Sequence, residues 1–112
     1  MVEKPTVVGN PSIKVSVLNG CGREGIASLF TEQLRKKGFD VVNGMGKNAD
    51  SFDFNLSAVV DRKGSPAKTQ IVADALGVKT ILKQKSSNPY VIEDVVFIIG
   101  RDWDTIIQQR EE

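Results

Sequence analysis

The first regular feature of the chain is an alternation of apolar and polar positions near its start. Ile13, Val15 and Val17 are apolar, and the residues between them, Lys14 and Ser16, are polar. A period of two places successive side chains on opposite faces of a β-strand. We therefore predict a strand that buries one face and leaves the Lys14 and Ser16 face in solvent.

Two later segments have the three- and four-residue spacing of amphipathic helices. The first is predicted to begin near Glu24 and to end near Lys37, where basic residues suit the negative end of the helix dipole. The second is predicted to begin with Ser65 as capping residue and Pro66 in the first turn, and to end at Gly77. The apolar positions are Ile26, Leu29, Phe30 and Leu34 in the first helix and Ile71, Val72, Ala75 and Leu76 in the second.

Four further segments are predicted to be strands, which gives the element order β-α-β-β-α-β-β. They span residues 39–43, 56–61, 80–83 and 93–99, and residues 44–54, rich in glycine, asparagine and aspartate, are predicted to form a loop. Right-handed crossovers place both helices on the same face of the sheet. The expected fold is an α+β two-layer sandwich, a mixed five-stranded sheet with two helices on one face. The alternative is a doubly wound sheet with helices on both faces.

The 112 residues have the length of a single domain. Residues 1–11 are interpreted as a linker or truncated N-terminal extension, because they hold two prolines and show little periodicity. Residues 12–103 form the predicted domain and residues 104–112 a C-terminal tail. No apolar stretch approaches the ~18 residues of a membrane span. We expect this fragment to be soluble and to meet a membrane only through a tether absent from this chain.

Composition excludes several classes of function. Lys and Arg number 15 and Asp and Glu 14, and the resulting net charge of +1 argues against nucleic-acid binding. The chain has no histidine and one cysteine, which argues against imidazole acid–base catalysis, an internal disulfide and a cysteine-rich metal site. Composition thus disfavours these chemistries.

The segment from Gly20 to Gly25 matches the pattern G-x-G-x-x-G between a predicted strand and a predicted helix. In dinucleotide-binding proteins this turn places a pyrophosphate on helix amides, and an acidic residue after the second strand holds the ribose. Here the second strand ends with Asn43 and Gly44, and the chain has no room for a second mononucleotide-binding half. The favoured interpretation is that the glycines permit positive φ and close helix–strand packing.

Three other groups of residues are candidates for chemistry or contact. Cys21 lies near a predicted helix N-terminus, but the chain has no histidine to act as its base, so a structural or incidental thiol is favoured. The loop with Asp50 and Asp53 lacks the glycine and the terminal glutamate of a calcium loop. Phe52 and Phe54 in this loop alternate, and one or both are predicted to fold inward as a lid over the sheet edge.

Short motifs lie in order along most of the predicted domain. They are Val15 to Gly22, Gly25-Ile26-Ala27, Leu34 to Phe39, Ala73 to Gly77, and Val95 to Gly100 with Asp102-Trp103. Together they resemble the LytR C-terminal domain family, which is found behind the LytR-CpsA-Psr catalytic domain of bacterial cell-envelope proteins, or alone behind a membrane anchor. Two positions depart from the family pattern. Cys21 stands where threonine or serine is usual, and Asp61-Arg62 where an apolar or aromatic residue is usual.

The resemblance implies a non-catalytic accessory domain on the extracytoplasmic face of the bacterial cell membrane, anchored there in the full-length protein. Together with the composition, it leads us to expect no catalytic residue, cofactor or metal ion. The near-neutral charge gives no support to the family's description as a transcriptional attenuator. With the polar strand face, the resemblance leads to the hypothesis that the domain binds cell-wall glycan or an envelope protein. The expected contacts are the open sheet face and Asn19, Gly20, Gly22, Arg62, Arg101, Asp102 and Trp103.

Two other hypotheses stay open. One is a nucleotide-binding domain that uses the turn from Gly20 to Gly25. The other is a structural spacer or homodimerisation module, in which the apolar final strand lies near a sheet edge and pairs with a second copy. Trp103, which follows that strand, is either a binding hot spot or, as we favour, a cap on the core.

Overall fold

The computed structural model describes residues 13–110, so the interpretation of residues 1–11 as a linker falls outside the described range. Within this range six strands and three helices follow one another in the order β1-α1-β2-β3-β4-α2-β5-β6-α3. The strands are β1 (Lys14–Asn19), β2 (Asp40–Val41), β3 (Lys47–Asn48), β4 (Ala58–Asp61), β5 (Thr80–Lys83) and β6 (Val95–Ile99). The helices are α1 (Ile26–Lys36), α2 (Pro66–Leu76) and α3 (Trp103–Arg110).

The six strands of the described range form one mixed sheet in the order β2-β1-β6-β4-β5, and β3 pairs with β1 outside this path. β6 is parallel to β1 and antiparallel to β4, and β4 is parallel to β5. The predicted α+β class and mixed sheet are confirmed. The predicted count of five strands is wrong, because β3 lies inside the segment predicted to be a loop.

The final strand, β6, lies at the centre of the sheet. Its residues pair with β1 on one side, for example Val95 with Val15, and with β4 on the other, for example Ile98 with Ala58. The dimerisation hypothesis placed this strand near an edge, and that placement is wrong. The unbroken apolar run of β6 instead reflects a strand with neighbours on both sides and little exposure on either face.

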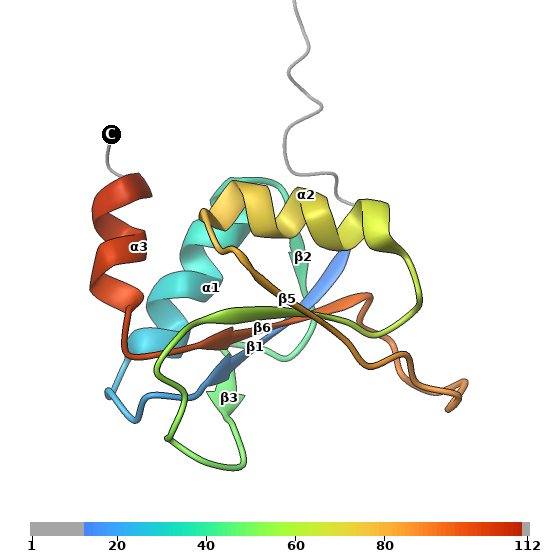
Figure 1. The fold of residues 1–112 in the computed structure, drawn as a ribbon, viewed down its shortest axis with the longest axis horizontal. Helices are drawn as coiled ribbons and strands as arrows, with labels where there is room; N and C mark the ends of the chain where they lie inside the picture. The colour runs from blue at the N-terminus through green and yellow to red at the C-terminus, as the bar shows by residue number, and fades with distance from the viewer. Residues whose placement is uncertain (1–12, 111–112) are drawn as a thin grey trace, which may run out of the picture.

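The helices lie on one side of the sheet and enclose a single core with it (Figure 1). Phe30 of α1 meets Phe97 of β6 edge to face, with ring centroids 5.2 Å apart. Leu76 of α2 and Ile106 of α3 are buried in the same cluster. The two-layer sandwich is therefore confirmed, and the doubly wound alternative is wrong. The predicted number of helices is too small by one.

The additional helix, α3, occupies most of the segment predicted to be a tail. Trp103, Ile106 and Ile107 follow the three- and four-residue spacing of a helix and pack in or against the core. This apolar pattern covers about one turn, which is too short to distinguish a helix from a tail in the sequence. A short helix in water depends on packing for most of its stability, and here the core supplies that packing.

The predicted capping role of Ser65 is wrong. Its side chain makes no capping hydrogen bond at the start of α2. Instead Oδ1 of Asp61, the last residue of β4, accepts hydrogen bonds from the backbone amides of residues 63, 64 and 65 at 3.1, 2.8 and 3.0 Å. A buried carboxylate therefore organises the turn before Pro66 opens the helix. At the other end, α2 stops at Gly77 (φ 71°), as predicted.

The outer edge of β1 is covered along its length by three partners. β2 pairs with its first half and β3 with its end. Between them the side chain of Asn43 replaces a strand residue: its Oδ1 accepts from the Val17 amide at 3.1 Å, and its Nδ2 donates to the Val17 carbonyl at 2.9 Å. Arg35 holds the bend after β2 by donating to the carbonyls of Val41 and Gly44. Among the strands that the structure describes, the outer ones are therefore β2 and β3, of two residues each, on the side of β1, and β5, of four residues, on the other side.

Candidate binding groove

The face of the sheet opposite the helices is less polar than predicted. Ser16 does lie on this face, but it is only 8% exposed, as is its pairing neighbour Val96. Val60, on the next strand, is 3% exposed. The expected solvated platform is therefore corrected to an apolar floor, drawn from four neighbouring strands and made of Leu18, Val60, Leu82, Val96 and Ile98.

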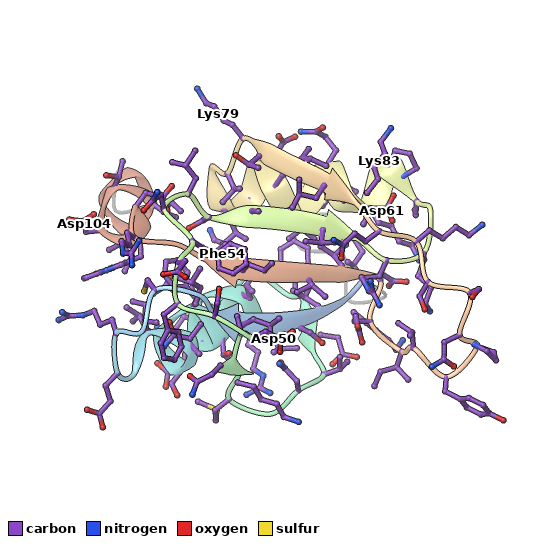
Figure 2. All side chains as sticks on the ribbon, turned by 60° about the horizontal axis from the view of Figure 1, so that its bottom comes forward. Asp50, Phe54, Asp61, Lys79, Lys83 and Asp104 are labelled. Atoms are coloured by element: carbon purple, nitrogen blue, oxygen red, sulfur yellow. The ribbon has the colours of Figure 1, made fainter. Side chains whose placement is uncertain are left out.

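A groove of about 500 Å³ lies over this floor. The segment between β3 and β4 forms one wall, and Figure 2 shows Asp50 and Phe54 of this segment against the open face of the sheet. Polar side chains of the rim are Asn48, Asp50, Arg62, Gln84 and Glu93. This volume falls in the range of roughly 300–1,000 Å³ that ligand sites occupy, and an apolar floor with a few polar groups is their usual character.

Phe54 is held in the groove by its backbone and by the absence of a side chain at Gly20. Its amide donates to the Gly20 carbonyl at 3.1 Å, and its own carbonyl accepts from the Arg101 amide at 2.9 Å. A Cβ at Gly20 would lie 2.7 Å from the Phe54 ring and 2.8 Å from the side chain of Ile98. Gly20 thus permits the close approach of the ring to the sheet. The prediction that one or both of Phe52 and Phe54 fold inward is confirmed for Phe54, whereas Phe52 is 43% exposed.

The glycine-rich turn after β1 is occupied by the protein itself. Oδ1 of Asn19 accepts from the amides of Cys21 and Gly22 at 3.1 and 2.9 Å. The ring of Phe52 lies against Gly22, where a Cβ would be 3.2 Å away. A phosphate would compete with Asn19 for the same donors, and this disfavours the nucleotide-binding alternative. At Gly22 and Gly25 φ is 82° and 81°, as the conformational interpretation of the glycines requires.

Arg101 and Asp102 fasten the groove wall to the end of β6. The guanidinium of Arg101 donates to Oδ1 of Asn55 at 2.8 Å and to the Phe52 carbonyl at 3.0 Å. Oδ1 of Asp102 accepts from the amide and the hydroxyl of Ser57 at 2.9 and 2.7 Å. Neither Arg101 nor Asp102 lines the groove. Both are positioning residues for the wall that does.

Trp103 closes the same end of the domain. It packs against the core, and Cζ of Arg23 lies 4.7 Å from its ring centroid. The Arg23 carbonyl in turn accepts from Nδ2 of Asn19 at 2.9 Å. The structure therefore supports the interpretation of Trp103 as a cap, tied to the turn after β1.

Arg62 lies apart from the other predicted site residues. It follows β4, which runs antiparallel to β6, so it lies where β6 begins rather than where it ends. Its Nη1 donates to the Gln84 carbonyl at 2.9 Å, and its Nε lies 3.8 Å from Oε2 of Glu93. Arg62 lines the groove. The remaining predicted residues meet at the opposite end of the sheet: Asn19, Gly20, Gly22, Arg101, Asp102 and Trp103.

The described part of the chain favours neither a metal site nor a reactive thiol. It holds no group of three or more Cys, Asp or Glu side chains that could bind a metal ion. Sγ of the half-buried Cys21 lies 3.5 Å from Oδ1 of Asn19, within the turn. The cysteine thus belongs to the local structure of the turn after β1.

Most of the groove rim was not predicted from the sequence. Asn48 and Asp50 come from one segment, and Gln84 and Glu93 from two others far along the chain. Two sequence signals pointed to groove residues: the alternation of Phe52 and Phe54 predicted that one or both would fold inward, and Arg62 was among the expected contacts.

Comparison with known proteins gives one match. A family model described as LytR cell envelope-related transcriptional attenuator matches residues 12–103, most of the chain, which confirms the resemblance drawn from its motifs. Neither the curated proteins nor the solved structures contain a match to this chain. In the part of the chain that the structure describes, no helix has the length and hydropathy needed to cross a membrane.

Proposed function

We propose a function from one premise: the chain belongs to the LytR cell envelope-related transcriptional attenuator family, and it is therefore associated with the cell envelope. On this premise the domain is a non-catalytic binding module on the extracytoplasmic face of the cell membrane. Its ligand is cell-wall glycan, held in the groove on the open face of the sheet. The observation that supports the proposal is the combination of an apolar floor and a polar rim in one groove.

The groove side chains match the chemistry of a sugar ring. A pyranose presents C–H groups on its faces and hydroxyl groups around its edge. The Phe54 ring and the aliphatic floor suit the C–H face, since both are apolar. At the rim, Asn48 and Gln84 each offer donors and an acceptor, whereas Asp50 offers acceptors only. Hydroxyl groups both donate and accept, so this mixture can satisfy them.

The carboxylates of the groove suit binding better than hydrolysis. Glycosidases use two carboxyl groups that flank the scissile bond, one as acid and one as base or nucleophile. Glu93 is instead paired with Arg62 at 3.8 Å, at the end of the groove away from Phe54. We therefore assign Glu93 the role of orienting the Arg62 guanidinium, which remains a donor to the ligand.

The proposal is tested by titrating the purified domain with N-acetylated amino-sugar oligosaccharides of the cell-wall type and recording amide NMR spectra. We expect shifts at Leu18, Gln84 and Ile98, which line the groove. Asp50→Ala and Gln84→Ala change exposed residues and should each weaken binding about fivefold, the effect of losing one hydrogen bond of about 1 kcal/mol. The matched control is Lys36→Ala, an exposed change on α1.

The resonances of the groove residues should all give the same dissociation constant. This constant should increase in the two groove variants and stay unchanged in Lys36→Ala. Shifts confined to the chain ends would refute glycan binding in the groove. The absence of any shift at millimolar oligosaccharide would refute it as well.

A further inference from the structure

The two edges of the sheet differ in a way that points to a second binding surface. On the side of β1 the edge consists of two strands of only two residues each, β2 and β3, with the side chain of Asn43 between them, whereas β5 on the other side is four residues long. The outer edge of β5 has no partner strand among the described residues. An uncovered edge presents backbone donors and acceptors in the spacing of a β-strand, and this spacing is complementary to another extended chain.

β5 contains no proline that would prevent another strand from pairing along this edge. Ile81 and Leu82 are 36% and 40% exposed, and they point to opposite faces of the sheet because they are adjacent in a strand. Leu82 lies on the groove side. A strand added beside β5 would therefore cover apolar surface on both faces.

The charge around β5 is strongly positive although the whole chain is nearly neutral. Residues 62–85 hold six Lys or Arg and one Asp, whereas the other 88 residues hold nine basic and thirteen acidic residues. Lys79 and Lys83 flank the two apolar residues of β5, and Lys85 follows them. Figure 2 shows Lys79 and Lys83 projecting at the outer edge of the sheet. None of these three lysines forms an ion pair with a described residue.

We propose that the open edge of β5 binds an extended acidic segment of a partner protein, which adds to the sheet as a further strand. The lysines alone would attract any polyanion, but the unpaired backbone edge is complementary only to a peptide backbone. Opposite charges on directly facing strand positions stabilise pairing. The segment expected to bind therefore has acidic residues two positions to either side of an apolar centre.

The same lysines disfavour a second copy of this chain as the partner. If two β5 strands paired antiparallel about Ile81, Lys79 of each copy would face Lys83 of the other. Like charges at directly opposed strand positions are destabilising. Lysines on an edge strand are a common device against such self-association. The edge of β5 therefore favours pairing with an acidic strand over pairing with a second copy of β5.

The inference is independent of glycan binding and is tested with a peptide. The probe is Ser-Glu-Val-Val-Val-Glu-Ser with both ends blocked, because its symmetric charge pattern fits β5 in either strand direction. Titration with this peptide should shift the amide NMR resonances of residues 80–84. Lys79→Glu/Lys83→Glu should weaken binding at least tenfold and should create binding of the matching peptide with lysine in place of glutamate. Both lysines are exposed, so the fold should be retained. Lys36→Glu/Lys47→Glu, which has the same net charge but lies away from β5, is the matched control.

Two N-methylated forms of the peptide separate strand addition from simple charge attraction. In a strand alternate amides point to opposite sides, so methylating one alternate set removes the donors that face β5 and methylating the other set does not. We expect one form to lose at least tenfold in affinity and the other to bind like the parent peptide. Equal binding of both forms, no shift at millimolar peptide, or self-association of the domain through residues 80–84 would each overturn the proposal.

Discussion

Replacing Asp61 by alanine measures how much one buried carboxylate contributes to the fold. Its Oδ1 accepts three backbone amides, and the residue is only 4% exposed. A hydrogen bond to a charged group contributes about 1.5–3 kcal/mol. Lys63 and Gly64 are exposed, however, so water can replace the carboxylate at their amides. The expected loss is therefore that of a helix cap, about 1–2 kcal/mol for Asp61→Ala. Asp61→Asn keeps an oxygen acceptor and should cost less than about 1 kcal/mol.

Urea unfolding followed by circular dichroism measures these differences. The midpoint should fall while the slope m is unchanged, because the surface exposed on unfolding stays the same. In thermal melts a domain of this size loses roughly 4–8 °C per kcal/mol. Asp50→Ala is the control, since it removes the same charge from an exposed position and should stay within about 0.5 kcal/mol of the parent. If Asp61→Ala proved as stable as Asp50→Ala, the carboxylate would not organise the turn, and our account of the start of α2 would be wrong.

Three further predictions address single contacts. Thr31→Val should raise the free energy of unfolding by about 1 kcal/mol in urea, because the fully buried hydroxyl of Thr31 has no hydrogen-bond partner in the described structure; a loss of stability would contradict this. In thermal melts Gly20→Ala should lower the free energy of unfolding by about 1–3 kcal/mol, because the added Cβ would lie 2.7 Å from a phenylalanine ring. Gly25→Ala should lower it by about 1 kcal/mol through its φ of 81° alone. A variant as stable as the parent would refute the corresponding reason. Asn43→Ala removes the acceptor of the Val17 amide and should speed amide hydrogen exchange at Val17 at least tenfold, whereas unchanged exchange would show that the side chain does not complete the sheet edge.

The elements that were predicted best are those whose boundaries depend on local chemistry. α2 begins at Pro66 and ends before Gly77, because proline fits the first helical turn and glycine adopts a left-handed conformation at its end. β5 spans the predicted residues 80–83. The error at the start of α2 arises because a residue four positions earlier replaces the expected one. Asp61 takes over the role expected of Ser65 because the fold brings its carboxylate under the turn.

The candidate groove was predictable only at single points. One or both of Phe52 and Phe54 were expected to fold inward, which Phe54 does, and Arg62 was expected to contribute to a contact surface. Their common groove was not expected, because the two residues approach it from opposite ends of the sheet. The antiparallel pairing of β4 with β6 separates Arg62 from Arg101, and no local sequence pattern encodes the direction of that pairing.

The sequence by itself determined the class of the fold, most of the buried apolar positions of the long elements and the family, although Leu29 and Ile71 of the predicted helix stripes are exposed in the structure. These properties depend on the period of apolar residues and on short motifs, which are set by backbone geometry over a few residues. Only the tertiary structure decided that β6 is central, that Asn43 completes an edge, that α3 joins the core and that β5 stays open. Such features depend on contacts between residues far apart in the chain, as between Lys14 and Asp94. The free energy of these long-range contacts depends on how all helices and strands pack together.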